Sequence, residues 1–225
     1  VPSDNGVPPH SKVHYSLVSD SRGVLYAATH GTGAPRGDYF WLPWNCWTHP
    51  VKQFNGSGLV AYDPAKDEIV FTDFLMPNEG TRCLAIAETR RKLYGISYPR
   101  NHFFIYDLEK RQLRDLGRIG SINPQCIFTD PEGNAYTTDD YGQLVTCDAE
   151  KEVLTETGLY LPHAEWRSGF HNVPYDVVSA PDGESVYGIT WTFGERFFSY
   201  DFKKKTIRDF GKAYGNESDE WLHII

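Results

Sequence analysis

An internal repeat constrains the fold of this 225-residue chain more than any other feature of its sequence. An aspartate that follows an aromatic residue or a cysteine closes an apolar stretch at four places, positions 63, 107, 148 and 201. The spacing is roughly 40 to 50 residues, the length of one supersecondary unit in many repeat proteins. Each repeat also carries a tyrosine followed by small and β-branched residues, as in Leu93–Tyr98 and Val186–Trp191. The sequence therefore contains four copies of one structural unit.

Within each copy, four short stretches alternate apolar and polar residues and are separated by turns rich in Gly, Pro, Asp or Glu. This alternation, with many aromatic and β-branched residues, predicts strands, and no segment keeps a 3.6-residue period over three turns. Four strands in a unit of this length predict the four-stranded antiparallel blades of a β-propeller. A β-sandwich is the all-β alternative, but it leaves the repeat unexplained.

We expect one all-β domain over residues 1–225, with blades at approximately 12–76, 81–118, 122–158 and 174–212 and the start of a fifth at 219–225. A propeller protects its edge strands by closing on itself. The final stretch, Asp219–Ile225, resembles a first strand without the rest of its blade. The expectation from the sequence is therefore an incomplete propeller that belongs to a larger ring.

Charge and composition argue against several classes of function. The chain has 22 Lys and Arg against 30 Asp and Glu, a formal net charge of -8, which does not suit a protein that binds nucleic acid or an anionic membrane. The short basic run Lys203–Lys205 falls in a predicted hairpin turn. No stretch approaches the roughly 18 apolar residues that a membrane span needs.

The repeat also predicts which residues share a location. In a blade, the start of the first strand, the end of the second and the start of the third lie on one face near the central channel, where strand ends present side chains on a rigid scaffold. Strand interiors repeat from blade to blade, whereas the residues predicted for this face do not. These are His14, Arg82, Pro124 and Tyr175, then His30, Tyr98, Asp140 and Trp191, then Gly58, His102, Gln143 and Arg196. We predict a functional site on this face; polar groups that merely line a wet channel are the alternative.

The side chains of the first two blades suit the removal of a proton beside a carboxylate. A neutral His or a deprotonated Tyr can take the proton, a Tyr hydroxyl can protonate a leaving oxygen, and Arg can neutralise the carboxylate. β-Elimination on a uronic-acid sugar needs this set, so the predicted catalytic residues are His14, His30, Arg82 and Tyr98. Glycoside hydrolysis would need two cooperating carboxylates, and the neighbours Asp139 and Asp140 point to opposite sides of a strand. Further residues expected to bind the substrate are His102, Asp140, Trp191 and Arg196.

A second candidate region is the long connection 31–56 in the first blade, which carries Trp41, Trp44 and Trp47. These side chains could form a platform on which sugars stack, or a plug packed over the channel, and the sequence favours neither. Cys46 and His49 have a C-x-x-H spacing that offers two ligands for zinc. Two ligands do not make a site, so zinc is the only cofactor that the sequence suggests and its other ligands are unassigned.

The stretches Lys12–His14, Leu25–His30, Leu93–Pro99, His102–Asp107 and Asp115–Arg118 resemble the β-propeller polysaccharide lyases that act on ulvan and related uronate-containing polymers. They are also similar to uncharacterised bacterial propellers related to those enzymes. The resemblance covers most of the chain and rests mainly on blade motifs. It implies a seven-bladed ring, elimination with His and Tyr as acid and base, an Arg that neutralises the carboxylate, and a zinc ion of mainly structural character.

Carried over by position, the resemblance assigns the acid–base roles to His30 and Tyr98. A further family His is expected at the start of the third strand of the first blade, where this sequence has Gly58; His102 holds the equivalent place in the second blade. The family's Arg matches Arg82, Arg114 or Arg118.

The sequence thus supports two functions. The first is a secreted or periplasmic polysaccharide lyase that cleaves a uronate-containing polysaccharide by β-elimination. The second is a non-catalytic propeller that binds carbohydrate or protein through the aromatic loop. The partner that we expect first is an acidic polysaccharide or oligosaccharide rather than nucleic acid or membrane.

Overall fold

The structure, a computed structural model, describes residues 9–31, 33–34, 48–121, 124–162, 172–191 and 196–212. Its strands form four antiparallel groups of four, which we call blades one to four. Blade one holds β1 (Lys12–Ser19), β2 (Leu25–His30), β3 (Gly56–Asp63) and β4 (Glu68–Pro77), and blade two holds β5 (Gly80–Ala87), β6 (Lys92–Tyr98), β7 (His102–Asp107) and β8 (Gln112–Arg118). Blade three holds β9 (Phe128–Thr129), β10 (Ala135–Thr138), β11 (Gln143–Cys147) and β12 (Leu154–Tyr160), and blade four holds β13 (Pro174–Ser179), β14 (Ser185–Thr190), β15 (Arg196–Asp201) and β16 (Thr206–Lys212).

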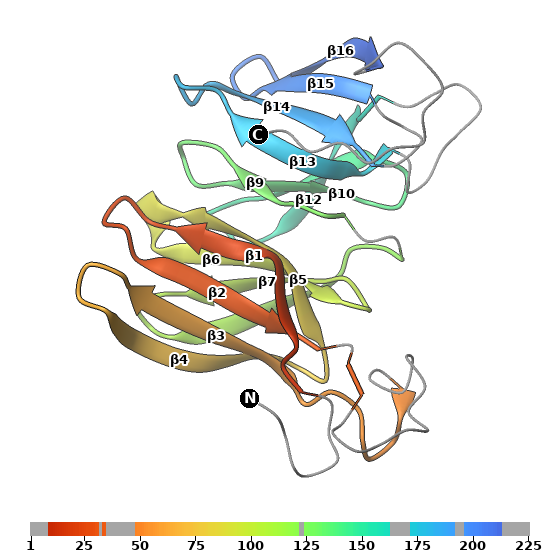
Figure 1. Cartoon of the computed structure of the whole chain (residues 1–225). Helices are drawn as coiled ribbons and strands as arrows, with labels where there is room; N and C mark the ends of the chain where they lie inside the picture. Colours follow the sequence, from red (N-terminus) through yellow and green to blue (C-terminus); the bar gives the residue numbers. More distant parts are fainter. Residues whose placement is uncertain are drawn as a thin grey trace.

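The predicted all-β architecture of four-stranded antiparallel blades is confirmed, and the blades follow one another from blade one to blade four (Figure 1). The first strand of each blade is the innermost. β1 and β5 meet in a parallel bridge between Tyr15 and Cys83, and the backbone N–H of Gln125, just before β9, donates to the carbonyl of Pro174 in β13. The stretch 219–225, predicted to start a fifth blade, lies outside the described residues. A single turn of 3-10 helix, η1 (Glu88–Arg90), joins β5 to β6.

The repeated aspartate at the end of each third strand closes the hairpin to the fourth. The carboxylate of Asp107 accepts hydrogen bonds from the backbone N–H groups of Glu109 and Lys110, and Asp148 does the same for Glu150 and Lys151. A short acceptor side chain at this position stabilises a turn. Just before the fourth strand begins, each hairpin turns through a residue with φ near +53°, namely Asp67, Arg111, Glu152 and Lys205.

Two glycines in the second strands explain another repeated feature. Gly95 in β6 pairs directly with Phe104 in β7, and Gly188 in β14 pairs with Phe198 in β15. A Cβ on Gly95 would come within 2.1 Å of the Phe104 ring, so the Gly makes room for the large residue opposite. Where the residue opposite is Val instead, in blades one and three, the second strand carries Ala27 or Thr137.

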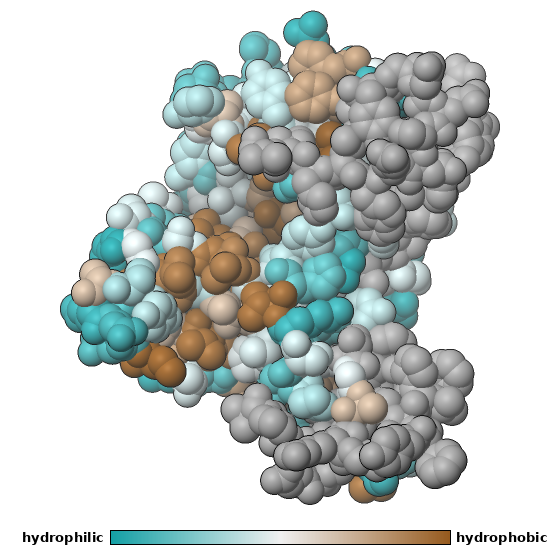
Figure 2. Space-filling view, viewed as in Figure 1, coloured by the Kyte–Doolittle hydropathy of each residue, from teal (hydrophilic) through white to brown (hydrophobic). Residues whose placement is uncertain are grey.

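The hydrophobic core consists of three clusters, one in each junction between consecutive blades. The repeated tyrosine of the second strand belongs to this packing, because Tyr26, Tyr94 and Tyr136 are all buried. Apolar atoms are also visible at the surface over β1, β2 and β3, on the side of blade one that faces away from blade two (Figure 2). Among the described residues, no helix is both long and apolar enough to cross a membrane.

Candidate functional site

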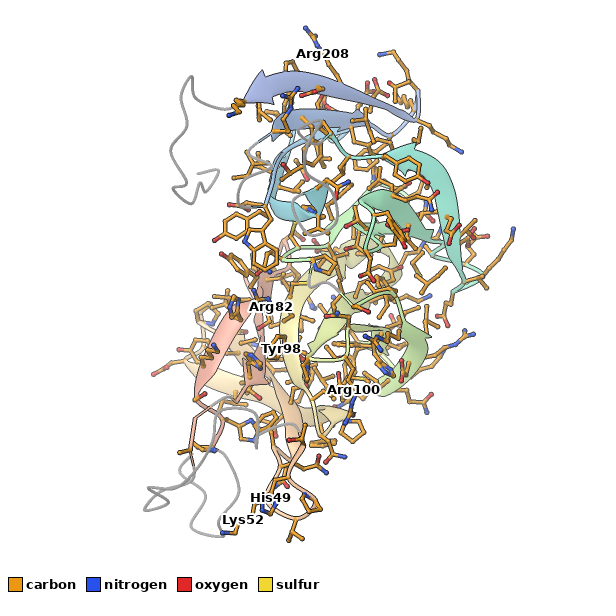
Figure 3. All side chains as sticks on the ribbon, turned by 90° about the vertical axis from the view of Figure 1, so that its right-hand side faces the viewer. His49, Lys52, Arg82, Tyr98, Arg100 and Arg208 are labelled. Carbon is orange, nitrogen blue, oxygen red and sulfur yellow. The ribbon has the colours of Figure 1, made fainter. Side chains whose placement is uncertain are left out.

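Four of the predicted face residues come together where the strands of blades one and two reach the channel. His14 lies near the start of β1, His30 ends β2, Arg82 lies near the start of β5 and Tyr98 ends β6. We call these four residues the channel cluster. Arg82 Nη1 lies 2.8 Å from His14 Nε2, and the rings of His30 and Tyr98 meet edge to face with centroids 4.9 Å apart. Figure 3 shows Arg82 and Tyr98 next to each other, with the Arg82 Cζ 5.8 Å from the centre of the Tyr98 ring.

Irregularities in the two inner strands aim these side chains. The register of β1 against β2 shifts between Val13 and Leu17, and that of β5 against β6 shifts between Thr81 and Cys83. A bulge of this kind redirects a side chain at the cost of ladder hydrogen bonds. In β1 the buried Ser16 hydroxyl replaces part of the ladder, since it accepts from the N–H of His14 and donates to the carbonyl of Ala28.

Arg82 is the centre of the cluster. Its guanidinium donates to the side-chain oxygen of Gln125 and to His14, while its buried Nε has no hydrogen-bond partner. Within the described residues, no carboxylate forms an ion pair with Arg82. Burial lowers the pKa of Arg82, but a guanidinium remains protonated in proteins. The channel cluster therefore contains a half-buried positive charge that has no carboxylate partner among the described residues and is held by neutral groups.

Both histidines are neutral at physiological pH. Burial, and then the charge of Arg82, lowers the pKa of His14 to about 4. Burial also lowers the pKa of His30 to about 3, with smaller contributions from Lys12, His14 and Arg82. Because a guanidinium can only donate, Nε2 of His14 accepts from Arg82 and the single ring proton of His14 sits on Nδ1.

His30 is almost fully enclosed, with 1% of its surface exposed. Its Nδ1 is buried and has no hydrogen-bond partner among the described residues. Gly80, at the start of β5, lies against that atom, and a Cβ at this position would come within 1.9 Å of it. His30 therefore packs against the ring of Tyr98 and exposes almost no surface to a molecule in the channel.

Aromatic residues extend the site from blade one to blade four. The hydroxyl of Tyr15 in β1 donates to that of Tyr175 in β13 over 3.0 Å, and the Tyr175 ring stacks on Trp191 with centroids 6.3 Å apart. Trp191, a predicted binding residue, is therefore linked to the channel cluster through Tyr175 and Tyr15. Tyr15 and Gln125 were not predicted as site residues. Their place in the sequence gives one indication. Tyr15 directly follows His14 and Gln125 directly follows Pro124, and both preceding residues were predicted for the face.

The other predicted residues of the face have partners away from the channel cluster. His102 Nδ1 lies 2.8 Å from a carboxylate oxygen of Asp115 in β8, and Arg196 forms an ion pair with Asp209 in β16. Asp140 accepts from the backbone N–H of Ser121. His102 and Arg196 both begin a third strand, and each pairs with a carboxylate of the adjacent outer strand. These three residues remain predicted binding residues.

The aromatic loop and the zinc prediction fall mostly outside the described residues. This applies to Trp41, Trp44, Trp47 and Cys46. His49 is described, and its Nδ1 accepts from the backbone N–H groups of Val51 and Lys52, which makes it a turn cap. The described residues contain no group of three or more His, Cys, Asp or Glu side chains arranged for a metal ion. Because Cys46 lies outside the described residues, the structure does not test this site, and zinc stays a prediction.

Comparison with known proteins places the fold. No protein-family model matches the sequence, and no curated protein matches it. Three similar solved structures are the β-propeller domain of Cps50 (Swd1) from Myceliophteria thermophila, the extracellular domain of the putative one component system BT4673 from B. thetaiotaomicron, and an auxiliary nutrient binding protein from Bacteroides thetaiotaomicron VPI-5482. Their identities to this chain are 12%, 14% and 14%, with TM-scores of 0.57, 0.50 and 0.55.

These matches cover 92%, 92% and 97% of this chain but only 58%, 29% and 47% of the respective solved chains. The chain thus spans between about a third and little more than half of the length of these solved chains. At such low identity the similarity shows the fold, a β-propeller, and no activity. The resemblance to bacterial propellers is consistent with two of the three structures; the resemblance to polysaccharide lyases stays a prediction.

Proposed function

We propose that the channel cluster binds the carboxylate of an acidic saccharide. The observation that carries this proposal is the half-buried guanidinium of Arg82, whose Nε is buried and which has no carboxylate partner among the described residues. A charge removed from water is costly unless it is paired. A ligand carboxylate would supply the missing charge, and a guanidinium fork can bind both of its oxygens.

The neighbours of Arg82 favour a sugar over a simple inorganic anion. The rings near this charge are those of Tyr98, Tyr15 and Tyr175, and Trp191 stacks on Tyr175. Such side chains combine an apolar face with a polar edge. A uronate has the matching chemistry, a carboxylate on a ring with C–H faces and hydroxyl groups. One of the similar structures is described as an auxiliary nutrient binding protein and another as an extracellular domain, which supports binding of such a nutrient outside the cytoplasm by this chain, in a secreted or periplasmic setting.

Titration calorimetry with oligomers of glucuronate and galacturonate, and with neutral oligosaccharides of equal length, tests the proposal. We expect binding of at least one acidic oligomer and at least a tenfold weaker affinity in Arg82→Met, equivalent to about 1.4 kcal/mol. Arg114→Met is the matched control, because Arg114 is exposed on β8 and pairs with Glu152. Absence of binding to every acidic oligomer, or equal binding by the Arg82→Met variant, would refute the proposal.

A second candidate function, β-elimination, is favoured by the two neutral imidazoles and the phenol beside Arg82. In that reaction a base takes the proton on C5 of the uronate, the electron pair forms the C4–C5 double bond, and the bond from C4 to the leaving oxygen breaks as that oxygen is protonated. The geometry supports binding better, because Nε2 of His14 already accepts from Arg82 and His30 is enclosed. Tyr98, which is half-buried, is the acid–base group that a substrate would touch.

Ultraviolet absorbance of the unsaturated product during incubation with polyuronates separates the two functions. Elimination predicts product formation by the wild type and a loss of about 100-fold or more in Tyr98→Phe, with saccharide binding retained. Tyr160→Phe, an exposed tyrosine in β12, serves as the control. If acidic oligomers bind but no polyuronate yields product, the elimination function is excluded and the binding function stands.

A further inference from the structure

Two neutral side chains from the neighbouring blades hold the guanidinium of Arg82. Its Nη1 lies 2.8 Å from Nε2 of His14 in blade one, and its Nη2 donates to the side-chain oxygen of Gln125, just before β9 of blade three. Gln125 is fully buried, whereas Arg82 is half-buried. The guanidinium is therefore fixed between blades by contacts that leave its charge uncompensated.

Two further neighbours of Arg82 are also neutral at physiological pH. Burial raises the pKa of Cys83 to about 12. Burial, together with the hydrogen bond to Tyr175, raises the pKa of Tyr15 above its usual value. A carboxylate is the strongest partner for a guanidinium, because two parallel charge-assisted hydrogen bonds can join them. At the place where such a partner would compensate the charge, the described residues supply the amide of Gln125.

The repeat indicates that the backbone at this position accommodates an acidic residue. Gln125 directly follows Pro124, and in blade four the residue that follows the equivalent Tyr175 is Asp176. Asp176 lies in β13 and accepts a hydrogen bond from the backbone N–H of Val177. Glutamine and glutamate side chains also have nearly the same size and shape. The difference between an amide and a carboxylate at position 125 is therefore one of charge rather than of space.

We propose that Gln125 sets the charge preference of the channel cluster, because its neutral amide positions the guanidinium of Arg82 without neutralising it. The inference rests on the proposed function, since it assigns the missing carboxylate to the ligand. A glutamate at position 125 would form an ion pair with Arg82 and compete with that ligand. A site that keeps a charge unpaired gives up stability in favour of binding.

Titration calorimetry with glucuronate and galacturonate oligomers tests the role of Gln125. Gln125→Glu should weaken the affinity for the oligomer that the wild type binds by at least about tenfold, because the new carboxylate occupies the guanidinium. Gln125→Met removes the hydrogen bond without adding a charge, so it should weaken binding less. Gln112→Glu is the matched control, because Gln112 is exposed at the start of β8; its affinity should stay within about twofold of the wild type.

Urea denaturation at pH 7 without saccharide tests whether Gln125 leaves the charge of Arg82 uncompensated. Gln125→Glu should raise the urea midpoint above that of the wild type, because the new carboxylate pairs with the guanidinium. In an Arg82→Met background the same change should lower the midpoint, because the carboxylate is then buried without a cation. A residue that only packs the structure would respond alike in both backgrounds.

The outcomes distinguish this inference from the proposed function. If the wild type binds an acidic oligomer and Gln125→Glu binds it equally well, the role of Gln125 is overturned and the proposed function stands. The same holds if Gln125→Met loses more affinity than Gln125→Glu. Equal changes of the urea midpoint in the two backgrounds would also overturn the role of Gln125. If the wild type binds no acidic oligomer, the proposed function fails, and the charge preference assigned to Gln125 fails with it.

Discussion

Blades two and four share the same sequence pattern but not the same surroundings. Both contain a Tyr-Gly-Ile second strand and a Phe-Phe-x-Tyr-Asp third strand, and both form four antiparallel strands with a Gly opposite a Phe. Blade two is covered on both faces, whereas the described residues leave open the face of blade four that carries Tyr187. The motif therefore encodes a blade, and the neighbouring blade decides whether its aromatic residues become core or surface.

The largest expected effect comes from replacing the equivalent tyrosine of the second strand in each of the two blades. Tyr94→Ala removes a fully buried ring and the hydrogen bond from its hydroxyl to the Gly133 carbonyl, so we expect a loss of about 3–5 kcal/mol in the free energy of unfolding. Tyr187→Ala should cost no more than about 1 kcal/mol, as for other surface substitutions. Urea denaturation measures both losses. Equal losses would contradict the difference in burial between the two tyrosines.

Substitution of the paired glycines should affect the two blades alike. A Cβ would lie 2.1 Å from the Phe104 ring at Gly95 and 2.6 Å from the Phe198 ring at Gly188. Both contacts lie within one blade, and overpacking of this kind costs about 1–3 kcal/mol. Gly95→Ala and Gly188→Ala should therefore lower the free energy of unfolding by similar amounts, with the larger effect at Gly95. A loss confined to one blade would show that the neighbouring blade sets the fit.

The smallest expected effect is a difference in the pH dependence of stability between the channel ends of blade one and blade four. Blade one has His14 and His30 where blade four has Tyr175 and Trp191. The pKa of His14 is lowered to about 4 and that of His30 to about 3 from 6.5, mainly by burial. The unfolded chain therefore binds more protons below pH 6.5, so the stability that the neutral rings provide is complete above 6.5 and is lost as the pH falls toward these values.

Urea midpoints measured from pH 7 to pH 5, above the range where most carboxylates titrate, isolate this contribution. The fall in stability should be shallower in His14→Gln and His30→Gln than in the wild type. Trp191→Phe should leave the slope unchanged, because blade four has no group at that position that titrates in this range. An unchanged slope in both histidine variants would contradict the assignment of the two rings as buried and neutral.

Much of the channel cluster could be derived from the sequence, since the repeat aligns the blades and alternation within each strand orients the side chains. This alignment brought His14, His30, Arg82 and Tyr98 to one face, and the structure joins them through hydrogen bonds and ring contacts. The alignment did not predict Tyr15 and Gln125, because the register of β1 shifts and β9 has only two residues, so these side chains depart from regular alternation. His102 and Arg196 were counted to the same face, but their contacts are with aspartates of the outer strands.

The sequence by itself determined the strands, their order and the positions that repeat, because these depend on local alternation and turn chemistry that each blade carries alone. Only the tertiary structure decided that His30 is enclosed by Gly80 and Tyr98, that Arg82 is held without a carboxylate partner among the described residues, and that Tyr187 is exposed while Tyr94 is buried. Burial and pairing arise between segments far apart in the chain. They depend on which blade packs against which, and a motif that is the same in every blade does not determine that packing.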